Sequence, residues 1–412
     1  MKRKLRLSLG TILSIILTII VLFAFWWVFS LLFKDESTNK KVDDIKLQVV
    51  NNENNNIKEN EVTIDDKMIY KNLQYVTINF AGLVNYDINM QKSISNSTSI
   101  NKQYNYFDEI NSYLNADINS FSILNTFDES KPFSDINAPR SIVEMLARSG
   151  FNVGSACGQN ILNQGAKGIN SIENAMAANN IYAFGINSAK PQMPNFIKQI
   201  DDVKVAFLQY TQSISNAGLI AINSENSNRY INTYSDSQVK FDVQSAKSHG
   251  ANIVIVFMHW NNDILSSDNY QRNVMQTIAN SGADIIIGSG QLLPQPFEVL
   301  TAFDEYGNKK NVPSVFSLGS ILSSNNDNVE NSSSIILNAK ISYDIDNKKI
   351  YKINFDYIPL CTVKDYPEEN SYYLLNPNNS TITDEQVKET AKNSLSFLNK
   401  LYANLPEEIE IY

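Results

Sequence analysis

Three side chains in the sequence have types that could support catalysis: Cys157, His259 and Asp263. A cysteine that an imidazole deprotonates is a recognised nucleophile, so Cys157 and His259 could form a dyad. His259 could instead work with Asp263 as a general base, or act as a lone metal ligand. Structural roles are the alternative, with His259 hydrogen-bonded at the end of a buried strand and Cys157 in a packing position.

Two apolar runs, at 253–257 and 283–287, indicate which elements would position such a site. Each run has the length of a buried strand and ends in a polar loop, and a helix-length segment separates them, which describes a β-α-β unit. In such sheets ligands bind beyond the carboxyl ends of the strands. The sequence therefore predicts a site in the loops 258–263 and 288–298.

Strands and helices alternate along most of the remaining chain. The patterns predict strands at 74–81, 116–124, 151–156, 203–210 and 315–319, and helices at 107–114, 141–148, 168–179, 237–249, 273–281 and 384–401. Two alternating segments, 335–345 and 349–357, indicate an antiparallel pair with a turn at Asp346 and Asn347. This order of elements predicts an α/β sandwich.

The first residues indicate a single-pass membrane anchor. Basic residues at positions 2, 3, 4 and 6 precede an apolar run at 11–33, which is long enough to span a bilayer as a helix. The basic residues place the tail at 1–10 in the cytoplasm and everything after Lys34 outside the cell membrane. A cleaved signal peptide is the alternative, but the run is long for one and no small-residue cleavage site follows it.

Composition indicates how the rest of the chain is organised. Residues 34–69 are polar and rich in asparagine, which predicts a flexible stalk before an extracytoplasmic domain at 70–412. The only two cysteines, Cys157 and Cys361, lie near apolar sequence, so we expect buried free thiols, with a disulfide as the alternative. The net charge of -9 argues against binding nucleic acid and against a polybasic membrane-surface role.

Four motifs, in the expected order, resemble the CapA family of poly-γ-glutamate capsule-synthesis proteins. They are GFNVGSACGQNILNQG at 150–165, HW at 259–260, GADIIIGS at 282–289 with QPFE at 295–298, and FSLGS at 316–320. The corresponding family patterns are GFDxxSLANNHxxDxG, HWGxE, GADxxIGxHPHxxQPxE and YSLGN. The order and spacing of the four motifs make the resemblance specific, and it extends over roughly 75–357.

The resemblance implies a calcineurin-like metallophosphatase-type α/β sandwich, but most of the family's metal-ligand positions are replaced. The replaced positions, which with Trp260 we call the vestigial cleft, are Leu83, Gln159, Asn160, Asn163, Gly290, Leu292 and Ser320. Leu124 also stands about where the family has a glutamate. A two-metal hydrolase needs several imidazoles and carboxylates at each ion, and the chain has two histidines in all. We therefore expect no metal and no other cofactor.

Anchor, stalk, motifs and missing ligands together suggest a membrane-anchored, extracytoplasmic CapA-like protein without catalytic activity. We expect it to assist the synthesis, export or retention of an anionic surface polymer such as poly-γ-glutamate, beside the synthase subunits. The alternative is an active hydrolase or transferase on a surface polymer that uses His259 and Asp263. A further alternative is a receptor that binds a small ligand in the vestigial cleft.

Overall fold

The computed structural model describes most of the residues in Met68–Tyr412. The described residues are 72–91, 106–188, 196–223, 227–261, 267–303, 307–325, 327–365, 371–379 and 382–412. The predicted cytoplasmic tail, anchor and stalk, at 1–10, 11–33 and 34–69, lie outside these residues. Within the described ranges, no helix combines the length and the apolar character needed to cross a membrane.

Among the described residues, the first of two sheets has nine strands in the order β14-β13-β12-β1-β2-β3-β4, with β11 beside β1 and β15 beside β13. The strands are β1 (Leu73–Val84), β2 (Ile118–Ile123), β3 (Val153–Ala156), β4 (Tyr182–Phe184), β11 (Ser320–Leu322), β12 (Ser333–Asp344), β13 (Lys349–Asp365), β14 (Ser371–Leu375) and β15 (Glu408–Glu410). β1 to β4 run parallel, whereas β12, β13 and β14 are antiparallel to their neighbours. The sheet is therefore mixed.

The second sheet has six strands in the part that the structure describes, in the order β5-β6-β7-β8-β10-β9. The strands are β5 (Phe196–Ile200), β6 (Val203–Thr211), β7 (Ile253–His259), β8 (Ile285–Ser289), β9 (Pro294–Phe303) and β10 (Lys309–Leu318). The strands from β6 to β10 in this order are parallel, and the two edge strands are antiparallel to them. Every side chain of β7 and β8 is buried, as their apolar runs require.

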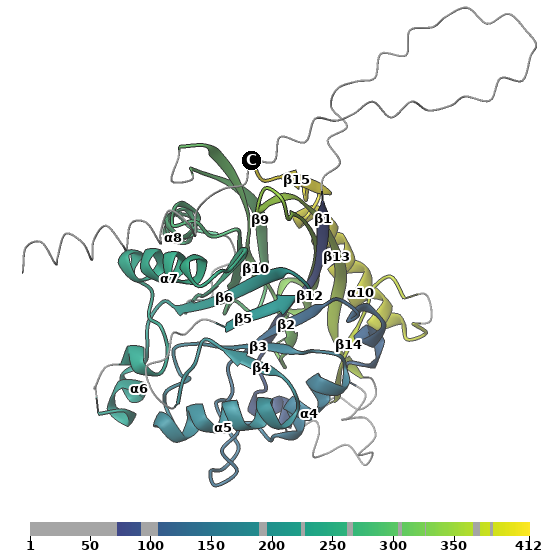
Figure 1. Cartoon of the computed structure of the whole chain (residues 1–412). Coiled ribbons are helices and arrows are strands. Elements are labelled where there is room, and N and C mark those ends of the chain that lie inside the picture. Colours follow the sequence, from purple (N-terminus) through teal and green to yellow (C-terminus); the bar gives the residue numbers. More distant parts are fainter. Residues whose placement is uncertain are drawn as a thin grey trace, which may run out of the picture. The chain divides into compact units, whose positions relative to one another are not determined.

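Helices cover the outer faces of both sheets, so the unit has layers of helix, sheet, sheet and helix. The helices are α4 (Ser141–Arg148), α5 (Gly165–Ala178), α6 (Asn216–Ala221), α7 (Asp236–Ser248), α8 (Asn269–Asn280), α9 (Val329–Ser332), α10 (Glu385–Leu401) and the 3-10 turns η1 (Asp108–Tyr113) and η2 (Ser227–Arg229). α4 and α5 pack on the first sheet, and α7 and α8 pack on the second (Figure 1). A separate apolar layer lies between the sheets.

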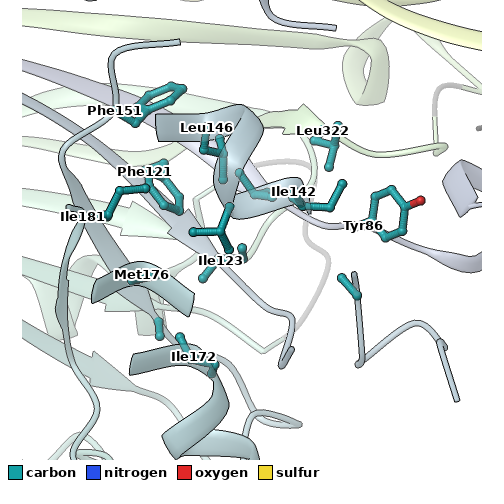
Figure 2. Close-up of a cluster of buried hydrophobic side chains, with 14 of the residues drawn as sticks. Tyr86, Phe121, Ile123, Ile142, Leu146, Phe151, Ile172, Met176, Ile181 and Leu322 are labelled. Atoms are coloured by element: carbon teal, nitrogen blue, oxygen red, sulfur yellow. The ribbon is translucent and has the colours of Figure 1, made fainter. Parts of the chain in front are cut away.

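The layer between the first sheet and its helices is a continuous apolar cluster. Figure 2 shows Ile142 and Leu146 of α4 and Ile172 and Met176 of α5 packed around Phe121 of β2. All five side chains are at most 1% exposed. The two named residues on each helix are four positions apart, a spacing that places both on one face of an amphipathic helix. At roughly 1.5–3 kcal/mol for each large apolar side chain, this layer contributes strongly to the stability of the sheet.

The predicted elements are present, with differences at places where local signals compete. The segment predicted as a helix at 107–114 forms only the 3-10 turn η1. α8 starts at Asn269 rather than 273, because Asp268 and Gln271 form a capping box there. The sequence 294–298, predicted as loop, opens strand β9, because Pro294 and Pro296 are tolerated on an edge strand. Strands β5, β14 and β15 are likewise not predicted by the sequence patterns.

A buried ion pair joins three strands of the second sheet. Lys310 of β10 places its Nζ 2.6 Å from Asp284 Oδ1, and both side chains are almost fully buried. The ammonium also donates to the carbonyls of Gly282 and Ala283, at 3.2 and 2.8 Å. The other carboxylate oxygen accepts a 2.7 Å hydrogen bond from the amide of Val254 in β7. The pair thus ties the start of β8 to β7 and β10.

Asp284→Asn is expected to lower the free energy of unfolding by about 3–5 kcal/mol, because it leaves the Lys310 ammonium buried without a counter-charge. Urea denaturation of the purified chain measures the change. The control is Glu385→Gln, which breaks the exposed ion pair with Lys388 on α10 and should change the stability little. Equal effects of the two substitutions would contradict this account of the buried pair.

Candidate functional site

A cleft of about 240 Å³ lies at the carboxyl ends of strands from both sheets. Its walls are the loops that follow β1, β2, β3, β7 and β8. All five strands belong to the parallel parts of their sheets, where ligand sites are expected. The two loops that the sequence singled out, 258–263 and 288–298, both contribute to it.

Many of the predicted site residues meet in this cleft. Those that line it are Leu124, Cys157, Gln159, Asn160, His259, Trp260, Gly290 and Leu292. Four further lining residues were not predicted, namely Asn85, Asp135, Ile136 and Gly158, and Asn261 falls in the predicted loop 258–263 without being named as a site residue. Asn85 and Asn261 could have been found, since each follows closely after a strand. Asp135 and Ile136 carry no such signal, because they come from the long loop between β2 and α4.

Three predicted cleft residues do not line the cleft. Leu83 and Ser320 are paired in neighbouring strands β1 and β11, and both are 1% exposed. The Ser320 hydroxyl donates a 2.8 Å hydrogen bond to the Leu83 carbonyl, so it closes the sheet rather than facing solvent. Asn163 accepts a hydrogen bond from Ser215 Oγ, at 2.5 Å, and thereby holds the start of α6. Asp263 lies outside the described residues.

Cys157 and His259 form the floor of the cleft and contact each other across the two sheets. Cys157 Sγ lies 3.4 Å from His259 Nδ1, and Ser289 Oγ is 4.0 Å from the same sulfur. Burial lowers the pKa of the imidazole to about 3 and raises the pKa of the thiol to about 12. At neutral pH the pair is therefore an uncharged thiol beside an uncharged imidazole, which is the opposite of an activated cysteine.

Two glycines make room for the imidazole. A Cβ atom on Gly158 would lie 3.2 Å from His259 Nε2, and one on Gly290 would lie 2.7 Å from His259 Cε1. Gly290 also has φ +100°, and its Cβ would come within 2.2 Å of the Trp260 carbonyl. No histidine fits at position 290 in this loop conformation, although the CapA motif has one there. The glycine at position 290 and the buried position of His259 therefore belong together.

Trp260 is a packing residue rather than an open stacking platform. Its side chain is 2% exposed, and its indole Nε1 donates a 2.9 Å hydrogen bond to the carbonyl of Phe316. Its backbone amide donates to the carbonyl of Ser289, at 2.8 Å. These two bonds fix the end of β7 against β8 and β10.

The residues of the cleft do not fit the metal centre that a metallophosphatase fold implies. In the described ranges, no group of three or more His, Cys, Asp or Glu side chains is placed to hold a metal ion. His259 Nδ1 faces the protonated Cys157, and its Nε2 lies against Gly158. The other polar residues that line the cleft are mainly neutral carboxamides, which are weak ligands.

The sequence matches the family model of the bacterial capsule synthesis protein PGA_cap over residues 77–325. This match covers more than half of the chain. The chain belongs to the PGA_cap family. The resemblance to the CapA proteins predicted from the four motifs is thereby confirmed. No curated protein sequence matches the chain.

The solved structures that match the chain include one phosphatase and two nucleotidases. A novel phosphatase from Mycoplasma pneumoniae is 11% identical with a TM-score of 0.40, and the match covers 70% of this chain and 94% of that one. The NAD nucleotidase NadN of Haemophilus influenzae is 12% identical with a TM-score of 0.42, over 78% and 63% of the two chains. A 5'-nucleotidase precursor from Thermus thermophilus is 11% identical with a TM-score of 0.40, over 81% and 60%. The matches thus span less than two thirds of the two nucleotidases.

The low pKa of His259 predicts a pH-dependent stability in this PGA_cap protein. The unfolded chain binds a proton at this residue near pH 6.5, but the folded chain does so only near pH 3. The free energy of unfolding therefore falls as the pH drops through this window, by about 2 kcal/mol between pH 7 and pH 5. His259→Gln should remove that loss, as measured by urea denaturation at both pH values. His249→Gln, at an exposed position, is the control and should keep it.

The raised pKa values of both thiols predict low reactivity. The structure has Cys157 and Cys361 as buried free cysteines, and burial raises the pKa of Cys361 to about 11. Iodoacetamide at pH 8 should leave both unlabelled in the folded chain and label both in urea, as seen by mass spectrometry. Rapid labelling of Cys157 in the folded chain, with Cys361 as the internal control, would instead support an activated dyad.

Proposed function

We propose that this protein is a non-catalytic, membrane-anchored member of the PGA_cap family that works outside the cytoplasm. In this role it assists the synthesis, export or retention of an anionic surface polymer such as poly-γ-glutamate, beside the polymer's synthase subunits. Family membership supports the connection to capsule synthesis. The apolar run at 11–33 and the basic residues before it support the anchor and its orientation.

The observation that carries the non-catalytic role is the state of the cleft floor. Cys157 and His259 are buried, contact each other and are uncharged at neutral pH. A general base works best with a pKa near the working pH, and the low pKa of His259 makes it a poor one. A nucleophilic cysteine needs its thiolate, which the burial of Cys157 disfavours.

The alternative of a hydrolase or transferase rests on the position of His259 in the cleft. Under that alternative His259 would take a proton from water or from a polymer hydroxyl, with Asp263 as its partner. The imidazole would then have to hold the proton at a pKa far above the value that its buried position favours. Substitution of the two residues separates the two functions.

In the source organism, His259→Gln and Asp263→Asn are expected to leave the amount of surface polymer unchanged, whereas deletion of the gene lowers it. Polymer is measured by hydrolysis of washed cells and quantification of the released monomers, with immunoblots to match protein levels. Asp284→Asn serves as the control for loss of the folded protein, since it breaks the buried ion pair. A polymer loss in His259→Gln at equal protein level would favour the hydrolase.

Metal analysis of the full-length purified chain gives a second readout. After incubation with manganese, iron or zinc and desalting, we expect far less than one ion per chain and no turnover of a phosphodiester substrate, because the donor set in the described part of the chain is incomplete. Stoichiometric metal together with turnover would overturn the proposal.

A further inference from the structure

The cleft contains no group that carries a positive charge at neutral pH, as far as its described lining shows. Among these lining residues there is no lysine and no arginine. His259, the one residue of that set that could become cationic, stays neutral because burial lowers its pKa to about 3. Asp135 at the rim adds a negative charge. A polyanion would gain no ion pair here and would be repelled by Asp135, so the cleft does not suit an anionic polymer.

The rim offers hydrogen-bonding groups that the described protein does not use. The carboxamides of Asn85 and Gln159 make no hydrogen bond to any described residue, and Asn85 is half-buried. Asp135 accepts from the amide of Ile88 through Oδ1, at 2.8 Å, and has a second carboxylate oxygen. Carboxamides both donate and accept, and the carboxylate accepts, which together match hydroxyl groups.

The walls and the size of the cleft restrict the ligand further. Leu124, Ile136 and Leu292 are half-buried and give the walls an apolar character. The volume of about 240 Å³ is below the roughly 300–1,000 Å³ of sites for drug-sized molecules. A small ring with apolar C–H faces and several hydroxyls fits these walls and this rim. An extended peptide fits less well, because peptides pair with strand edges and this cleft lies at strand ends.

We propose that the cleft binds one uncharged sugar unit of a surface glycan, with Asn85, Gln159 and Asp135 holding its hydroxyls. This inference deepens the extracytoplasmic, non-catalytic role proposed above and rests on it. Sugar binding would attach the protein to this surface glycan. The anionic polymer would then be contacted by another part of the chain or by the synthase subunits. No bond is made or broken in this role.

Isothermal titration calorimetry with the full-length chain tests the proposal. The neutral probes are glucose and N-acetylglucosamine with their short oligomers and an uncharged γ-glutamyl amide, and the anionic probes are glutamate, short poly-γ-glutamate and inorganic phosphate. We expect saturable binding of a neutral sugar. Gln159→Ala and Asn85→Ala should each weaken it about tenfold, as expected for loss of a hydrogen bond. Asn280→Ala is the matched control, because this exposed asparagine ends α8, away from the carboxyl ends of the strands.

Several outcomes would overturn the proposal. They are no binding of any neutral sugar, sugar binding that Gln159→Ala and Asn85→Ala leave unchanged, or binding of an anionic probe that these variants abolish. Preference for an uncharged γ-glutamyl amide over every sugar would also overturn it in favour of an amide ligand. None of these outcomes would change the result of the polymer measurement on the deletion strain, which tests the proposed function. If instead the deletion strain keeps its polymer while the chain binds sugar, the proposed function fails and the sugar site stands.

Discussion

The packing of one sheet against the other is the contact on which the rest of the structure depends. Phe80 and Phe184 of the first sheet meet Phe257 of the second, with ring centroids 6.0 and 5.0 Å apart. Aromatic contacts of this kind, within a fully buried apolar layer, fix the two sheets face to face. Because the parallel strands of both sheets then end at one side, their loops converge there. The cleft is a consequence of that convergence.

The sequence predicts well those features that depend on a single strand. The all-apolar runs of β7 and β8 predict buried strands, and the residues that follow them, such as His259, are found in the cleft. It does not predict features that depend on packing between distant segments. The sequence suggests that Cys157 and His259, 102 positions apart, could meet, but it does not predict that burial leaves both uncharged. The sequestration of Leu83 depends on strand β11, which only the folded sheet brings beside it.

Apolar and neutral side chains dominate the cleft of this member of the PGA_cap family. In a metallophosphatase-type site, polar side chains face the cleft because ions compensate the cost of removing them from water. In this chain, the positions that correspond to metal ligands in the CapA motifs avoid that cost in another way. They hold apolar residues, as at Leu83 and Leu292, or neutral ones, as at Gln159 and Asn160. His259 is accommodated in the interior because Cys157 contacts it and because burial keeps it uncharged. The fold is built around three buried apolar layers, one between the sheets and one under the helices of each sheet.

The positive φ of Gly290 also limits how such a site can change over evolution. A residue with a side chain at this position meets both a backbone carbonyl and the neighbouring ring, so the family's histidine cannot be restored by one codon change. The segment after β8 would first have to take a different path, and the imidazole below it would have to swing toward solvent. Reversal at this position therefore requires a change of backbone conformation in addition to a change of residue.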